Sequence, residues 1–168
     1  STQAPSDIVN ISFEDCIVTD APDQKFVDGQ RVPFILSPPP SLSVTITTPD
    51  HTAAFVQTHR RRIDQAVNEY GAIVFRGFPL SSTTDFDVFV KGFDGWNDLS
   101  YDKSMSFAVR KRFGGNEPGG TSRICTTNEG KSGGLVFHHE QAQTPLWPSY
   151  VFFCCQLPAA PGDGGATG

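Results

Sequence analysis

The apolar residues in the first half of the chain recur at spacings that predict two amphipathic helices. Between about Thr52 and Tyr70 they fall on one helical stripe, and Gly71 is placed to end that helix in a left-handed conformation. The stripe comprises Phe55, Ile63, Ala66, Val67 and Tyr70. A second helix is predicted after the hydroxyl side chains of residues 81–83, which are good N-caps. Its apolar face comprises Phe86, Phe89, Val90 and Phe93, and we interpret this aromatic stripe as core.

Short apolar segments around these helices predict β-strands. Residues 1–50 form an N-terminal arm of short strands, in which the segment 43–47 alternates polar with β-branched residues. The first helix is followed by residues 72–75, a continuous apolar run that is typical of a strand buried on both faces. The pattern in the first half of the chain therefore predicts strands placed before and after the first helix.

The second half of the chain has less regular periodicity. Residues 94–134 are rich in glycine and predict a long loop with one or two short strands, of which 123–127 is the strongest candidate. From Phe137 onward the pattern predicts a strand, a proline-rich turn at 145–148 and a strand at 150–156. The last of these segments is apolar on both alternating faces, so we expect a covering layer on each side.

Length, composition and charge narrow the class of protein. A chain of 168 residues can form one domain with a real core, and 14 Phe with 16 Gly and 13 Pro indicate an aromatic interior and many turns. The net charge of -5 gives no broad electrostatic reason to expect nucleic acid as a partner. The basic run at 60–62 is interpreted as a solvated helix face rather than a phosphate site. No apolar run approaches the roughly 20 residues of a membrane-spanning helix, so we expect a soluble or peripheral protein.

The N-terminus and the cysteines bear on the cellular compartment of the protein, for which more than one alternative remains. The chain begins with Ser1 and its first methionine is Met105, so we expect a processed or trimmed N-terminus, and import into an organelle is one alternative. The cysteines lack the spacing of a zinc site and the density of a disulfide scaffold, which predicts reduced, buried thiols and favours a reducing compartment. They are Cys16, Cys125, Cys154 and Cys155.

The His138-His139-Glu140 triplet carries the candidate chemistry. Side chains two positions apart on a strand share a face, so we expect His138 and Glu140 to project together and His139 to face the opposite layer. An imidazole and a carboxylate are two of the three ligands of a two-histidine, one-carboxylate Fe(II) site. No histidine follows position 139. His59 is a weak substitute, because it lies on the first predicted helix beside three arginines. The carboxylates Glu129 and Asp163 are interpreted as turn or loop residues.

Five motifs, taken in order, give the chain a family resemblance. They are residues 69–78, Asp85-Phe86 with Phe89-Val90, Phe137-His138-His139-Glu140, residues 151–155 and the Pro- and Gly-rich run 158–167. Each motif is weak alone. The ordered set, over about residues 33–168, resembles the N-terminal half of the TauD/TfdA-type, clavaminate-synthase-like Fe(II)/2-oxoglutarate dioxygenases.

The resemblance implies a fold and a site. The fold would be α+β or mainly β: a partial double-stranded β-helix, or jelly roll, in residues 51–168, with two N-terminal helices packed on it. His138 and Glu140 map onto two iron ligands, and Thr167 maps onto a threonine that contacts a carboxylate of 2-oxoglutarate. The family's distal histidine and the arginine that pairs the other carboxylate lie in its C-terminal half, and residues 132–168 contain no Lys or Arg.

Two functional hypotheses follow from this resemblance. One is an oxygenase that uses Fe(II) and 2-oxoglutarate to hydroxylate a small organic substrate, with the remaining site residues supplied by sequence beyond this chain. The alternative is a catalytically inert, dioxygenase-like structural or accessory subunit of a larger assembly, for example a membrane-bound energy-transducing or photosynthetic complex. Under either hypothesis we expect the 168 residues alone to be inactive, and an absent C-terminal half or a covering protein partner to complete the fold.

Overall fold

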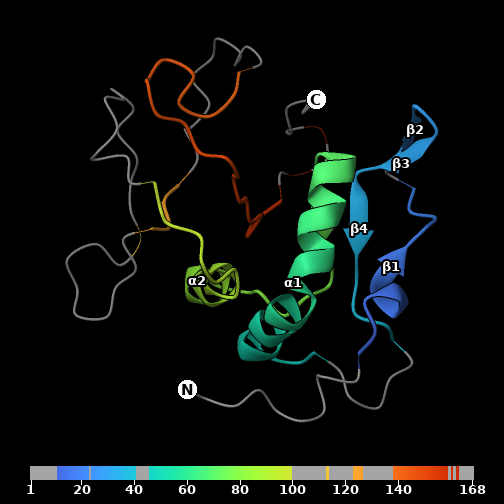
Figure 1. Ribbon diagram of the computed structural model, residues 1–168. Helices are drawn as coiled ribbons and strands as arrows, with labels where there is room; N and C mark the ends of the chain where they lie inside the picture. Colours follow the sequence, from blue (N-terminus) through green and yellow to red (C-terminus); the bar gives the residue numbers. More distant parts are fainter. Residues whose placement is uncertain are drawn as a thin grey trace. The chain divides into compact units, whose positions relative to one another are not determined.

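The computed structural model describes residues 11–22, 24–40, 46–99, 113, 123–126, 138–158, 160 and 162. These residues form a mixed α/β structure with two α-helices and two small sheets (Figure 1). The chain divides into two compact units, one of residues 1–81 with 88–95 and the other of 82–87 with 96–168. The expected jelly roll stays a prediction, because the described strands all lie in the first unit.

A three-stranded sheet holds the first unit together. Its order is β1 (Ile17–Val18), β4 (Phe34–Leu36) and β5 (Ile73–Phe75), and a 3-10 helix, η2 (Glu14–Cys16), leads into β1. β1 runs antiparallel to β4, whereas β5 runs parallel to it with Phe34 opposite Ile73. Parallel neighbours need a long crossover connection, and the first long helix lies within it.

A hairpin of β2 (Lys25–Val27) and β3 (Gln30–Val32) forms the second sheet. Its two turn residues, Asp28 and Gly29, have φ angles of 48° and 85°. Positive φ at both positions suits the right-handed twist of a tight hairpin, and Asp-Gly is among the favoured sequences for it. The Gln30 side chain donates a hydrogen bond of 3.1 Å to Glu69 on the first long helix. The N-terminal strands expected from the sequence are therefore present, and one hairpin is tied to a helix.

The helix α1 (Pro49–Tyr70) confirms the first predicted helix and begins three residues before the expected start at about Thr52. Thr48 is the N-cap, and its hydroxyl accepts a 3.2 Å hydrogen bond from the backbone N–H of His51. Gly71 ends the helix with a φ of 74°, and its N–H donates to the carbonyl of Val67 at 2.9 Å. Both ends therefore satisfy backbone groups that would otherwise lack partners.

The buried face of α1 packs on the sheet beside it (Figure 1). Phe55 and Ile63 are 0% and 2% exposed, and the sheet contributes Leu36 at 0%. Burying a side chain of this size is worth about 1.5–3 kcal/mol. The predicted stripe is confirmed at Phe55, Ile63 and Ala66, which are buried, whereas Val67 and Tyr70 are half-buried.

An aromatic cluster joins β5 to the second helix, α2 (Thr83–Lys91). The Phe75 ring lies 5.0 Å from that of Phe89 and 6.5 Å from that of Phe93, both nearly edge-on. Aromatic pairs prefer such edge contacts. The core interpretation of this stripe is confirmed, since Phe86, Phe89 and Phe93 are buried. The expectation that residues 72–75 are buried on both faces is wrong: β5 is only half-buried.

Two arginines of the basic run at 60–62 are paired within the chain. Arg60 contacts Asp64 at 2.9 Å, and Arg62 contacts Glu14 at 2.6 Å. The Arg62 guanidinium also lies 5.0 Å from the centre of the Phe13 ring. Pairs at this exposure contribute little to stability but fix the direction of the side chains. The interpretation of the run as a helix face agrees with this arrangement.

Several other expectations fail or fall outside the described residues. In the segment 43–47, residues 43–45 lie outside them and 46–47 form no strand. Only Cys16 is a buried thiol, because Cys125 and Cys154 are half-buried and Cys155 is exposed. Burial, with Asp15 nearby, raises the pKa of Cys16 to about 11. Within the described part of the chain, no helix is long and apolar enough to cross a membrane.

We expect Thr48→Ala to lower the free energy of unfolding by about 1 kcal/mol, because the N-cap hydroxyl no longer accepts from His51. The control is Thr58→Ala, an exposed position in the middle of α1, where alanine improves helix propensity slightly. Urea unfolding followed by circular dichroism measures both variants. Equal midpoints for the two variants would show that the cap contributes nothing to stability.

Candidate functional site

His138 and His139 lie in an irregular segment, and Glu140 begins a turn. The N–H of Ala142 donates to His139 O at 3.2 Å, and the N–H of Thr144 donates to Gln141 O at 2.9 Å. Two consecutive turns of this kind replace the alternation of a strand. The expected strand is therefore wrong at His138 to Glu140, and Phe137 lies outside the described residues. The shared-face argument for His138 and Glu140 no longer applies.

The side chains of the triplet differ in their surroundings. His138 and His139 are exposed, and Glu140 is half-buried. The His139 Nδ1 atom lies 3.2 Å from Glu140 O, and its ring meets the Trp147 ring edge-on at 6.0 Å. His139 thus packs within its own loop.

Two buried polar side chains anchor the loop that follows the triplet. Thr144 is 6% exposed, and its hydroxyl lies 3.0 Å from Gln141 O and also contacts Leu146 O. Gln141 is 4% exposed with a φ of 57°, and its Oε1 atom has no hydrogen-bond partner among the described residues. A buried acceptor in this position is costly and needs a donor. Sequence reasoning missed Gln141, because its burial depends on a turn that the pattern did not predict.

The side chains of the triplet are of the types that bind iron, but they supply only part of the ligand set of an iron site. Imidazole and carboxylate are the ligands that non-haem Fe(II) takes from proteins, and His138 and Glu140 offer one of each. Among the residues that the structure describes, no group of three or more His, Cys, Asp or Glu side chains could hold a metal. The other candidates, Thr167, Glu129 and Asp163, lie outside the described residues.

His59, the substitute ligand weighed from the sequence, has a role in the core of the first unit. Its Nε2 atom lies 2.8 Å from Ile11 O, so this nitrogen carries the proton and donates. The ring also packs 4.7 Å from Phe55 and 5.9 Å from Phe13. These contacts explain the histidine without a metal.

Arg123 was not singled out from the sequence, yet it pairs with two carboxylates of the second unit. Its Nε atom lies 3.1 Å from Asp87 and 3.4 Å from Asp98. The Asp87 side chain is 5% exposed, so the guanidinium offsets a buried negative charge on α2. Of the expected strand at 123–127, residue 127 lies outside the described residues, and among 123–126 only Cys125 is a bridge residue, beside a 3.0 Å hydrogen bond from Phe113 N to Ile124 O.

The predicted strand at 150–156 is absent, because these residues have no regular secondary structure. The Tyr150 ring stacks on Trp96 at 4.1 Å with an interplanar angle of 11°, and Phe152 lies 5.8 Å from the same indole. Other apolar side chains of this region are exposed to solvent: Phe153 is 74% exposed and Leu157 is 87% exposed. The described residues of this chain do not supply the covering layer expected on each side, so that layer stays a prediction.

Comparisons with known proteins match most of the chain. The family model described as "Taurine catabolism dioxygenase TauD, TfdA family" matches residues 40–168. A clavaminate synthase-like protein of Arabidopsis thaliana is 32% identical over 160 residues. The match covers 90% of this chain and 43% of that relative, so the chain spans less than half of the relative's length.

We expect Arg123→Gln to lower the free energy of unfolding by about 2 kcal/mol, because it removes a positive charge beside the buried carboxylate of Asp87. The control Arg61→Gln, on the exposed face of α1, should change it by less than about 0.5 kcal/mol. In an Asp87→Asn background the cost of Arg123→Gln should shrink. An unchanged cost in that background, measured by urea unfolding, would contradict the proposed pairing.

Proposed function

The chain belongs to the TauD/TfdA family of dioxygenases, and on that premise we propose that it is the N-terminal part of an oxygenase that uses Fe(II) and 2-oxoglutarate to hydroxylate a small organic substrate. The observation that carries the proposal is the family match over residues 40–168, which contains the His-x-Glu triplet.

His138 and Glu140 are the proposed metal ligands. Neither is fully buried, so both side chains can be reached by an ion from solvent. Bound Fe(II) would supply the redox chemistry that couples decarboxylation of 2-oxoglutarate to hydroxylation of the substrate. The buried Gln141 and Thr144 support this role, because they fix the loop immediately after the two ligands.

Thr167 is the proposed contact to the cosubstrate. A threonine hydroxyl can donate a hydrogen bond to a carboxylate, which is the role of the matching residue in the family. Residues 132–168 supply no Lys or Arg for the second carboxylate. We therefore place the pairing arginine, and the third iron ligand, in sequence beyond residue 168 of a longer form.

The same longer form would cover the apolar surface at 146–157. The exposed side chains on this segment are Leu146, Trp147, Tyr150, Val151, Phe153 and Leu157. At about 25 cal/mol per Å², a few hundred Å² of such surface represents several kcal/mol. A strand from the C-terminal half of the same polypeptide is the proposed cover, and a separate protein partner is the alternative.

We expect the 168-residue chain to bind Fe(II) weakly and to form no succinate from 2-oxoglutarate and oxygen. In a longer form, His138→Ala or Glu140→Ala should lower turnover at least about 100-fold, because each removes a ligand of the metal. His139→Ala is the matched control and should be much milder, since His139 packs on Trp147. Succinate formation and iron content after dialysis are the measurements.

Equal losses from all three substitutions, with folding retained, would contradict the proposed ligand set. Iron binding without turnover in the longer form would point to the inert, accessory-subunit hypothesis instead. Stoichiometric iron with succinate formation by the 168 residues alone would show that the described ligands suffice, and would overturn the need for a distal histidine and arginine.

We expect the 168-residue chain to self-associate, and Leu146→Ser with Leu157→Ser to reduce that association, because both side chains are exposed on the apolar segment. Phe26→Ser is the control: Phe26 is equally open, at 73%, but lies on the β2–β3 hairpin. Light scattering and amide exchange measure the outcome. A soluble monomer with strong protection over 150–156 would disprove the need for a cover.

A further inference from the structure

The loop that carries the proposed metal ligands holds one residue in an unfavourable arrangement. Gln141 has a φ of 57°, in the left-handed region that favours glycine. It is 4% exposed, and its buried Oε1 atom has no hydrogen-bond partner among the described residues. A left-handed backbone and a buried, unpaired acceptor each cost free energy. Both costs therefore fall on the residue that follows Glu140.

Three hydrogen bonds hold the turn at 139–144 and offset these costs. The N–H of Ala142 donates to His139 O at 3.2 Å, and the N–H of Thr144 donates to Gln141 O at 2.9 Å. The hydroxyl of the buried Thr144 donates to the same carbonyl at 3.0 Å. Each of these bonds is similar in size to either cost at Gln141, so the turn has no large margin of stability. A ligand that favours another conformation can therefore shift this segment.

The turn and the binding of a metal make opposite demands on residues 138–140. In an extended conformation, side chains two positions apart share a face, so His138 and Glu140 would project together. The turn lacks that alternation. A metal that takes both side chains therefore favours the extended conformation, in which Gln141 also leaves the left-handed region.

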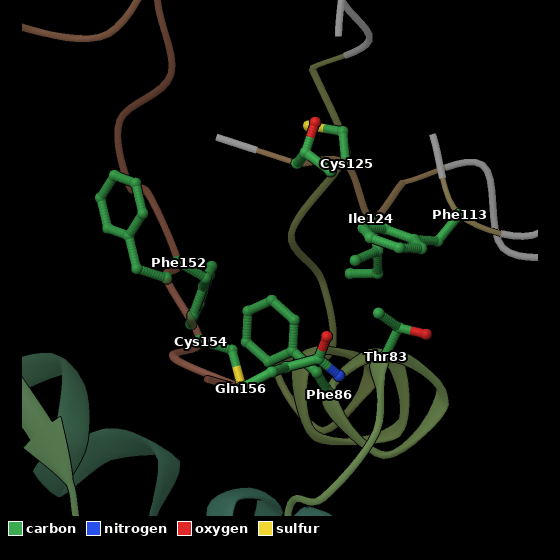
Figure 2. A pocket seen from close by; sticks show the side chains of 10 residues that line it. Thr83, Phe86, Phe113, Ile124, Cys125, Phe152, Cys154 and Gln156 are labelled. Carbon is green, nitrogen blue, oxygen red and sulfur yellow. The ribbon is translucent and has the colours of Figure 1, made fainter. Parts of the chain in front are cut away.

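The pocket of the second unit lies apart from this loop. Figure 2 shows the side chains that line it, which come from the first turn of α2, Phe113, the segment 124–126 and the segment 152–156. No residue of 138–144 lines the pocket. A ligand held there would therefore not act directly on the loop.

We propose that residues 138–144 form a metal-coupled switch. Without metal they form the described turn, and binding of Fe(II) by His138 and Glu140 shifts them to an extended conformation. The inference rests on the ligand pair of the proposed function and adds a role for Gln141. Gln141 is a positioning residue, because its left-handed backbone and unpaired acceptor set the populations of the two states.

Two substitutions of Gln141 should shift these populations in opposite directions. Gln141→Gly removes both costs and should favour the turn, whereas Gln141→Val should favour the extended state, because a β-branched residue resists a left-handed backbone. The reporter is amide exchange of Thr144, whose N–H is bonded in the turn. In the 168-residue chain without iron, Thr144 protection should rise at least about fivefold in Gln141→Gly and fall by a similar factor in Gln141→Val.

Matched controls use the same substitutions one position along the chain. Ala142 is exposed and its φ is not positive, so Ala142→Gly and Ala142→Val should each change Thr144 protection by less than about twofold. The amide of Gly71, which donates to Val67 O at the end of α1, reports whether the first unit is folded and should not change. Mass spectrometry with residue-level fragmentation measures both amides.

Iron provides the second part of the experiment. Fe(II) at millimolar concentration, kept under argon, should lower Thr144 protection several-fold, and His138→Ala should abolish this effect. The Fe(II) concentration at half effect should rise about fivefold in Gln141→Gly and fall about fivefold in Gln141→Val, because apparent affinity follows the population of the binding-competent state. Equilibrium dialysis measures the bound iron independently, and no turnover is needed.

The outcomes separate this inference from the proposed function. Equal Thr144 protection in the Gln141→Gly and Gln141→Val variants, or the reverse order, would overturn the two-state segment whatever iron does. Iron that binds through His138 without changing Thr144 protection would overturn the coupling and leave the proposed ligands intact. No bound iron at millimolar concentration would overturn both the switch and the proposed ligand pair.

Discussion

The burial of one face of α1 against the sheet is the constraint on which the first unit depends. Phe55, Ile63 and Leu36 are almost wholly removed from water, and burying a side chain of this size is worth about 1.5–3 kcal/mol. The crossover through α1 allows β4 and β5 to be parallel neighbours. In that pairing Phe75, the last residue of β5, lies opposite Leu36 of β4. The aromatic cluster around Phe75 then connects β5 to α2.

The second helix, α2, contributes residues to both units of the chain. Its residues 88–91 belong to the first unit and its residues 83–87 to the second. On the second unit's side, the buried carboxylate of Asp87 requires a positive partner, and Arg123 supplies it. That ion pair joins α2 to the otherwise irregular segment that follows Arg123.

The candidate iron ligands have the right chemical groups for Fe(II), but the backbone does not place them as a strand would. The imidazole of His138 and the carboxylate of Glu140 fit Fe(II) by type, and the family match covers both. Their placement in a turn means that strand alternation does not bring them together. Buried groups such as Gln141 and Thr144, rather than a sheet, hold this loop. The proposed C-terminal half would add the third iron ligand, the arginine that pairs the cosubstrate, and neighbouring strands.

Local patterns in the sequence determined α1, its glycine cap, β5 and the aromatic face of α2, because each depends on residues within one or two turns of one another. The family, too, was evident from the order of motifs. Tertiary structure decided the rest. A local pattern does not contain the backbone partners that distant parts of the sequence supply. These partners decide whether residues 138–140 form a strand or a turn, and whether residues 150–156 are covered. The pairing of Arg123 with Asp87 likewise exists only once segments far apart in the chain meet.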